Sequence, residues 1–114
     1  MATSGLSGPY PLTTPGILAA VSSYNPGAYA LGKTVENVFR IHYVGRSDVD
    51  VATRLQDHVS KWYPEFKFGY FQTAQAAFEK ECHLYHNFSP PDNLVHPAKP
   101  QGSNHKCPVC GYLG

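Results

Sequence analysis

Two short tripeptides place tyrosine side chains where they could act together in one chemical site. Gly27-Ala28-Tyr29 and Tyr43-Val44-Gly45 each lie in a run of strand-forming residues, and Arg46 directly follows the second. A polar, turn-capable segment separates the two runs, so the pattern predicts a β-hairpin that brings both phenols onto one sheet. A free tyrosine has a pKa of about 10 and is a poor base at neutral pH, but a neighbouring cation lowers that pKa. We therefore expect Arg46 to activate a tyrosine for proton transfer.

A helix is predicted directly after the second strand. Ser47 is a suitable N-cap, and Asp50 three residues later completes a variant of the capping box. Apolar residues then recur at helical spacing and predict a buried stripe: Val51, Leu55, Val59 and Trp62. Tyr63-Pro64 ends this helix, because the residue before a proline disfavours helical geometry.

Both predicted helices carry residues that could do chemistry. Arg54 and His58 are four residues apart, so they share a second face of the first helix. A third strand is predicted over residues 66–72, and a second helix over about residues 74–86. That helix carries two carboxylates, Glu79 and Glu81.

The order of these features resembles the GIY-YIG nuclease family, which has a Gly-x-Tyr strand, a Tyr-x-Gly strand and then a helix bearing an arginine. Residues 47–58 are similar to the family's Gly-x-Ser-x-Asp-Leu-x-x-Arg-Leu-x-x-His run, and residues 77–81 to its Ala-x-x-x-Glu helix. The resemblance covers roughly residues 27–93, with Ala28 where the family usually has Ile or Val. It implies a metal-dependent endonuclease that hydrolyses phosphodiester bonds in nucleic acid.

The resemblance also implies a role for individual residues. One tyrosine would help activate water, Arg54 would face the phosphate, and Glu81 would hold Mg²⁺ or Mn²⁺. A single glutamate suffices for Mg²⁺, which keeps most of its waters. The implied catalytic residues are Tyr29, Tyr43, Arg46, Arg54, His58 and Glu81, and the implied substrate-binding residues are Gly45 and Asn93.

Alternatives stay open for several of these residues. Glu81 fits the family's apolar register and its spacing to Asn93 better than Glu79 does. His58 could bind the phosphate, shuttle a proton or have no role. Each tyrosine taken singly could be a half-buried sheet residue, Arg54 a solvated helix arginine, and Glu81 an exposed helix glutamate.

The end of the chain has the spacing of a metal site. Cys107-Pro-Val-Cys110 supplies two zinc ligands, and structural zinc takes four. Cys82 and His86 are one helical turn apart and point the same way, so we expect a Zn²⁺ site of Cys82, His86, Cys107 and Cys110. His96 is the main substitute for His86, with His83 and His105 less favoured. Free thiols are the alternative.

These patterns together predict an α/β (α+β) fold with a small three-stranded antiparallel sheet, flanking helices and a zinc-stabilised, loop-rich tail. Residues 1–22 are expected to be a flexible segment rich in Gly, Ser, Thr and Pro, although residues 17–23 are apolar and could form a short helix or strand. Residues 23–93 would form the catalytic domain, and residues 94–114 the tail that packs on the last helix.

Composition limits the partners and the compartment. The chain has 114 residues and a net charge of +1, so any contact with nucleic acid would be local and not an extended basic surface. It has no apolar run long enough to span a bilayer, and its three cysteines do not pair evenly. We expect a cytoplasmic protein, either monomer or homodimer, that acts on nucleic acid, with DNA as the expected substrate. The competing functions are a non-catalytic nucleic-acid-binding module and a zinc-containing protein-interaction module.

Overall fold

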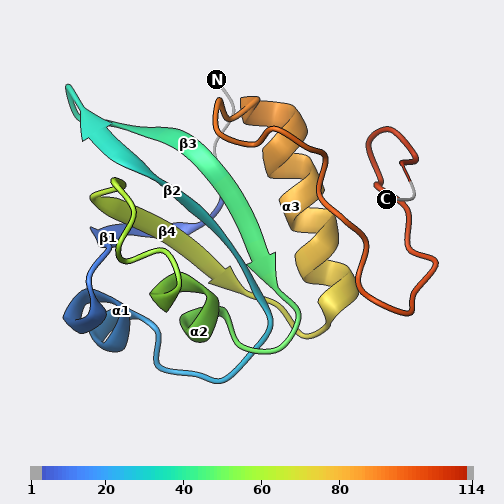
Figure 1. The fold of residues 1–114 in the computed structure, drawn as a ribbon, viewed down its shortest axis with the longest axis horizontal. Coiled ribbons are helices and arrows are strands. Elements are labelled where there is room, and N and C mark those ends of the chain that lie inside the picture. Colours follow the sequence, from blue (N-terminus) through green and yellow to red (C-terminus); the bar gives the residue numbers. More distant parts are fainter. Residues whose placement is uncertain (1–3, 113–114) are drawn as a thin grey trace.

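A four-stranded antiparallel sheet forms the centre of the computed structural model, which describes residues 4–112 (Figure 1). The strands lie in the order β1-β4-β2-β3, and their bounds are β1 (Ser7–Pro11), β2 (Gly27–Val35), β3 (Val38–Ser47) and β4 (Glu65–Tyr70). The predicted hairpin and third strand are confirmed as β2, β3 and β4. The expectation of three strands is wrong, because residues 7–11, which composition assigns to a poorly ordered segment, form β1 and pair with β4. Its prolines are tolerated because β1 is an edge strand.

The hairpin register brings the two tyrosine tripeptides side by side. Glu36 and Asn37 form a two-residue turn with φ values of 52° and 67°, which matches the twist of the paired strands. In the resulting register Tyr29 lies opposite Gly45. A β-carbon at position 45 would lie 2.5 Å from the Tyr29 hydroxyl, so only glycine lets this ring lie across the neighbouring strand.

Three helices cover the sheet: α1 (Thr14–Ala20), α2 (Val51–Gln56) and α3 (Ala74–Phe88). The helix predicted over residues 74–86 is confirmed as α3, whose N-cap Thr73 accepts a hydrogen bond from the Ala76 N–H. Thr13 caps α1 in the same way.

The helix after β3 is shorter than its sequence pattern predicts. Asp50, not Ser47, is the N-cap of α2, because the Ser47 hydroxyl instead accepts hydrogen bonds from Val49 and Asp50 in the turn before the helix. After Gln56 the chain continues in i→i+3 turns, and Trp62, expected in the buried stripe, is 56% exposed. Val51 and Leu55 alone keep that stripe fully buried.

Alternating residues of β2 divide the core between the two faces of the sheet. Tyr29 and Leu31 pack with α1 and α2 on one face, whereas Ala28 and Ala30 pack under α3 on the other. Figure 1 shows α3 on the side of the sheet opposite α1 and α2. Small side chains on the α3 face let that helix approach the strands closely.

The tail packs on the last helix. The segment after α3 runs back beside this helix (Figure 1), and Cys107 packs against Phe78 and Cys82 in a small buried cluster. In the described part of the chain, each helix is too short or too polar to cross a bilayer.

Gly45→Ala tests the close approach of the two strands. The added methyl group would collide with the Tyr29 ring, so we expect a loss of about 1–3 kcal/mol in the free energy of unfolding, measured by urea denaturation. Gly69→Ala is the matched control, because its β-carbon would meet the flexible end of Leu6 at 3.2 Å. Equal stability of the two variants would contradict this packing.

Candidate functional site

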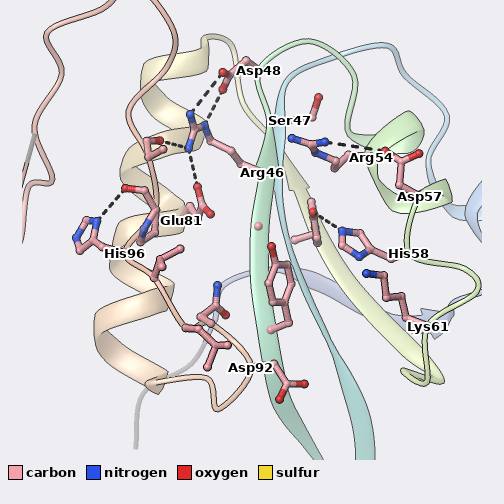
Figure 2. Close-up of a pocket in the computed structure, with 18 of the residues that line it drawn as sticks. Arg46, Ser47, Asp48, Arg54, Asp57, His58, Lys61, Glu81, Asp92 and His96 are labelled. Carbon is pink, nitrogen blue, oxygen red and sulfur yellow. Dashed lines mark hydrogen bonds and ion pairs between the residues drawn. The ribbon is translucent and has the colours of Figure 1, made fainter. Parts of the chain in front are cut away.

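A cavity of about 850 Å³ opens beside the edge strand β3 (Figure 2). Its floor is β3, one wall comes from α2 and the turns after it, and the other comes from α3 and the segment that follows. The cavity brings together all eight catalytic and substrate-binding residues predicted from the sequence: Tyr29, Tyr43, Gly45, Arg46, Arg54, His58, Glu81 and Asn93.

Tyr29 and His58 form the polar centre of the α2 wall. Tyr29 is buried, and its hydroxyl lies 2.9 Å from His58 Nε2. The Tyr43 ring lies 5.5 Å from the same imidazole, so His58 contacts both tyrosines of the tripeptides. His58 was expected on α2, one turn after Arg54. It lies instead in the turn that follows α2, and there it contacts the two phenols.

Neither tyrosine is activated in the way the sequence suggests. Burial raises the pKa of both phenols, and the nearby Glu81 carboxylate raises them further. The cation that opposes this rise is Arg54, so the expectation that Arg46 lowers a tyrosine pKa is wrong. Both phenols stay protonated at neutral pH and can donate hydrogen bonds.

His58 is the group of this wall that can accept a proton. Burial lowers its pKa below the ordinary 6.5, and the positive charges of Lys61 and Arg54 lower it further. The imidazole is therefore neutral at pH 7. Its Nδ1 is buried and has no hydrogen-bond partner among the described residues.

Arg46 and Glu81 face each other on the α3 side of β3. Arg46 Nη1 donates to Glu81 Oε1 at 2.8 Å, and Arg46 Nε donates to Asp48 Oδ1 at 2.7 Å. Both side chains of the Arg46–Glu81 pair are about nine-tenths buried, with exposed fractions of 11% and 9%. Figure 2 shows this group across β3 from Arg54 and His58.

Glu81, not Glu79, is the carboxylate of the cavity. Burial raises the pKa of Glu81, while the hydrogen bond and charge of Arg46 oppose that rise. Its second oxygen has no hydrogen-bond partner among residues 4–112, which leaves it open to a metal ion. Glu79 lies outside the cavity lining and contacts Gln75.

Asn93 lines the cavity, and its amide group is hydrogen-bonded to β3. Its side chain accepts from the Val44 N–H at 2.8 Å and donates to the Val44 carbonyl at 3.0 Å. Next to it, the Asp92 N–H donates to the His42 carbonyl, and the Tyr63 hydroxyl donates to the Asp92 carboxylate at 2.6 Å. Residues 89–98, which we call the strap, thus cap the free edge of β3 as a further strand would.

Four charged residues of the cavity were not identified from the sequence. Asp48 lies two residues after Arg46, just beyond the end of β3, a spacing that could have indicated the ion pair. Asp57 lies three residues after Arg54, at the end of α2. Lys61 and Asp92 come from irregular segments whose positions depend on tertiary contacts. With them, the lining contains three Lys or Arg residues and four Asp or Glu residues, so a phosphate would meet a net acidic site.

A second cluster of ligands lies behind the strap. His86, His96, Cys107 and Cys110 have ligand atoms within 4.8 Å of one another, close enough to hold one metal ion. His86 Nε2 lies 3.3 Å from His96 Nε2, which lies 3.5 Å from Cys110 Sγ. Zinc bonds are about 2.0–2.1 Å to nitrogen and 2.3 Å to sulfur. A tetrahedral ion would therefore place two nitrogen ligands about 3.3 Å apart, and a nitrogen and a sulfur ligand about 3.5 Å apart. The distances here match these values, so the donors fit structural zinc.

Neighbouring groups prepare these ligands for metal. His96 Nδ1 donates to the Pro97 carbonyl at 2.8 Å, which leaves Nε2 with its lone pair toward the cluster. Burial opposes ionisation of Cys107, but hydrogen bonds from the backbone of Cys110 and Val109 lower its pKa to about 6. The metal-binding thiolate is therefore the main form of Cys107 at neutral pH.

Cys82 is not part of this group of four, and the expected ligand set is corrected on this point. Burial raises the pKa of its thiol, which contacts Cys107 and packs beside Phe78. His96, expected as a substitute for His86, instead takes the place expected for Cys82.

Metal analysis of variants distinguishes the two ligand sets. We expect one zinc per chain in the wild-type protein and in Cys82→Ala, because Cys82 lies outside the cluster. We expect less than a tenth of that in Cys110→Ser and His96→Ala, since a structural site needs all four ligands. Zinc loss in Cys82→Ala with retention in His96→Ala would contradict the assignment.

Titration of His58 tests the electrostatics of the α2 wall. NMR of the imidazole, assigned with His58→Gln, should give a midpoint below 6.5. Between the folded pKa and 6.5 the unfolded chain binds a proton that the folded chain does not, so His58 makes stability fall as pH drops through this range. A midpoint above 6.5 would contradict the burial and the charges described.

No protein-family model, curated protein or solved structure matches this chain. The resemblance to the GIY-YIG family stays a prediction from sequence.

Proposed function

We propose that this protein is a metal-dependent endonuclease of the GIY-YIG kind, with its active site in the cavity beside β3. The observation that supports the proposal is the convergence of the two tyrosines, His58, Arg54 and Glu81 on one cavity. These residues come from five separate elements or turns, so their meeting is a property of the fold and not of local sequence.

The acidic balance of the cavity supports a metal requirement. Glu81 would hold Mg²⁺ or Mn²⁺ through the carboxylate oxygen that Arg46 leaves free. When bound, such an ion supplies neutralisation of phosphate charge and polarisation of water. Without a cation, a phosphodiester would enter a lining with more carboxylates than cationic side chains.

Arg54 is the cation best placed to contact the phosphate. Its side chain is 57% exposed, and its ion pair with Asp57 is long, at 4.0 Å. Exposed pairs of this kind are weak, so the guanidinium is free to exchange Asp57 for a phosphate. There it would stabilise the charge that develops on the phosphoryl oxygens.

His58 and the tyrosines would divide the proton chemistry. His58 Nε2 faces the Tyr29 hydroxyl and Nδ1 is buried, so a proton from water would reach the imidazole through Tyr29. The Tyr29 oxygen would accept the proton of the attacking water while its own proton passes to Nε2 across the 2.9 Å hydrogen bond, and the pKa of His58, below 6.5, leaves the ring neutral and able to take it. Under this scheme Tyr29 relays the proton, Tyr43 offers a donor toward the substrate, and His58 is the final proton acceptor.

Zinc would serve a structural role in the tail. Residues 89–112 contain no helix or strand, and buried residues are few among them. A four-ligand site would stabilise such a segment by linking it to α3 through His86.

A second candidate is a zinc-stabilised protein-interaction module. Leu94 and Val95 favour it, because they are 90% and 77% exposed at the rim of the cavity. Metal-dependent cleavage of nucleic acid separates the two functions.

Nicking of supercoiled plasmid in Mg²⁺ or Mn²⁺ tests the proposal, with single-stranded and branched DNA and RNA as further substrates. We expect Glu81→Gln and Arg54→Ala each to lower the rate about 100-fold or more, because one loses the metal ligand and the other the phosphate contact. EDTA should stop cleavage.

Glu79→Gln is the matched control, since Glu79 lies on the same helix outside the cavity. It should cleave at the wild-type rate. Glu81 is buried, so Glu81→Gln could lose activity through a folding defect. Arg54 is exposed, so Arg54→Ala should fold normally and tests the site independently of such a defect. Full activity in both Glu81→Gln and Arg54→Ala would refute the assignment.

A further inference from the structure

Four of the five N–H donors of Arg46 contact acceptors within the protein. Nε and Nη2 contact the two oxygens of Asp48 at 2.7 Å and 3.5 Å, and Nη1 donates to both Glu81 and the Ala98 carbonyl. The guanidinium also lies over the Phe78 ring, at 5.1 Å from its centre. A side chain so occupied cannot turn toward a phosphate without breaking these contacts.

The partners of Arg46 belong to a closed ring of contacts that begins and ends on α3. His86 of α3 and His96 of the strap are both ligands of the metal cluster. Two residues beyond His96, the Ala98 carbonyl accepts from Arg46, which holds Glu81 of the same helix. The Glu81 carboxylate is therefore connected to the metal cluster through Arg46, the Ala98 carbonyl and the chain from Ala98 to His96.

We infer that the metal cluster positions the catalytic carboxylate: a metal ion at His86, His96, Cys107 and Cys110 fixes the strap, the strap fixes Arg46, and Arg46 holds Glu81. Arg46 is thus a positioning residue and not a phosphate ligand. The part of this inference that concerns cleavage rests on the proposed function. The part that concerns the strap does not.

Without metal, the strap loses one of its two anchors. His86 and His96 would keep the 3.3 Å contact between their Nε2 atoms but lose their bonds to a shared ion, and the stronger anchor left would be the contacts of Asp92 and Asn93 with β3. Local opening becomes easier when a segment has few contacts, and here it would release the Ala98 carbonyl from Arg46.

One amide group of β3 and one indole report on the strap directly. The Val44 N–H donates to Asn93, so its hydrogen exchange measures opening of the strap. Trp62, the one tryptophan in the chain, lies against Tyr63 and His42 with ring centres 4.6 Å and 4.8 Å away. Both neighbours hold Asp92, so Trp62 fluorescence responds to the same opening.

The first test compares zinc-bound protein, zinc-depleted protein and Cys110→Ser, a variant that removes a ligand outside the cavity lining. We expect exchange at Val44 to accelerate at least tenfold in both metal-free forms, with a change in Trp62 emission, while amides of the central strand β2 stay protected. Asn93→Ala should open the strap with zinc still bound. Unchanged exchange at Val44 after zinc removal would overturn the inference, and so would equal loss of protection in β2, which would indicate global unfolding.

The second test separates positioning from phosphate binding. Arg46→Lys keeps the positive charge but cannot make the separate hydrogen bonds to Asp48, Glu81 and Ala98. We therefore expect Arg46→Lys and Cys110→Ser each to raise the Mg²⁺ concentration for half-maximal cleavage about tenfold. The KM for the nucleic acid should not change. A raised KM with an unchanged Mg²⁺ requirement would overturn the positioning role. Absence of cleavage by the wild-type protein would count against the proposed function, and hydrogen exchange would still decide the role of the strap.

Discussion

The buried ion pair between Arg46 and Glu81 connects the parts of this molecule that form the cavity. Through one guanidinium, β3 is joined to the turn before α2 by Asp48, to α3 by Glu81 and to the strap by Ala98. Removing one partner of a buried pair typically costs about 3–5 kcal/mol, because the other charge is left without compensation. Burial raises the pKa of Glu81, and the hydrogen bond and charge of Arg46 oppose that rise.

The free edge of β3 explains why the cavity and the metal cluster lie together. An edge strand exposes unpaired N–H and C=O groups, and here Asp92 and Asn93 satisfy those of His42 and Val44. The strap that does this buries little apolar surface, since Leu94 and Val95 are exposed, so it needs another source of stability. Four ligands for zinc supply it, as metal sites do in small domains whose cores are limited. The absence of a side chain at Gly45 then lets groups from both faces of the sheet meet at this edge.

Local pattern predicted the hairpin, β4 and α3, because residue alternation and helix periodicity indicate them, whereas the eight cavity residues were named from the resemblance to a known family. It did not predict β1, whose Pro-rich sequence lacks alternation and which gains its order from pairing with β4. Nor did it select His96 over Cys82: residues four apart on a helix are offset by about 6 Å along its axis, so His86 reaches the cluster while Cys82 stays beside Phe78. The raised tyrosine pKa values depend on burial, which residue spacing does not reveal.

The proposals place two different metal ions in this protein, one at the cluster of His86, His96, Cys107 and Cys110 and one at the Glu81 carboxylate. Crystals grown with zinc and soaked in Mn²⁺ would distinguish the two, through anomalous scattering measured at the absorption edges of both metals. We expect a zinc peak within the cluster and a separate manganese peak at Glu81. A manganese peak that avoids Glu81, or zinc bound by Cys82 in place of His96, would contradict these proposals.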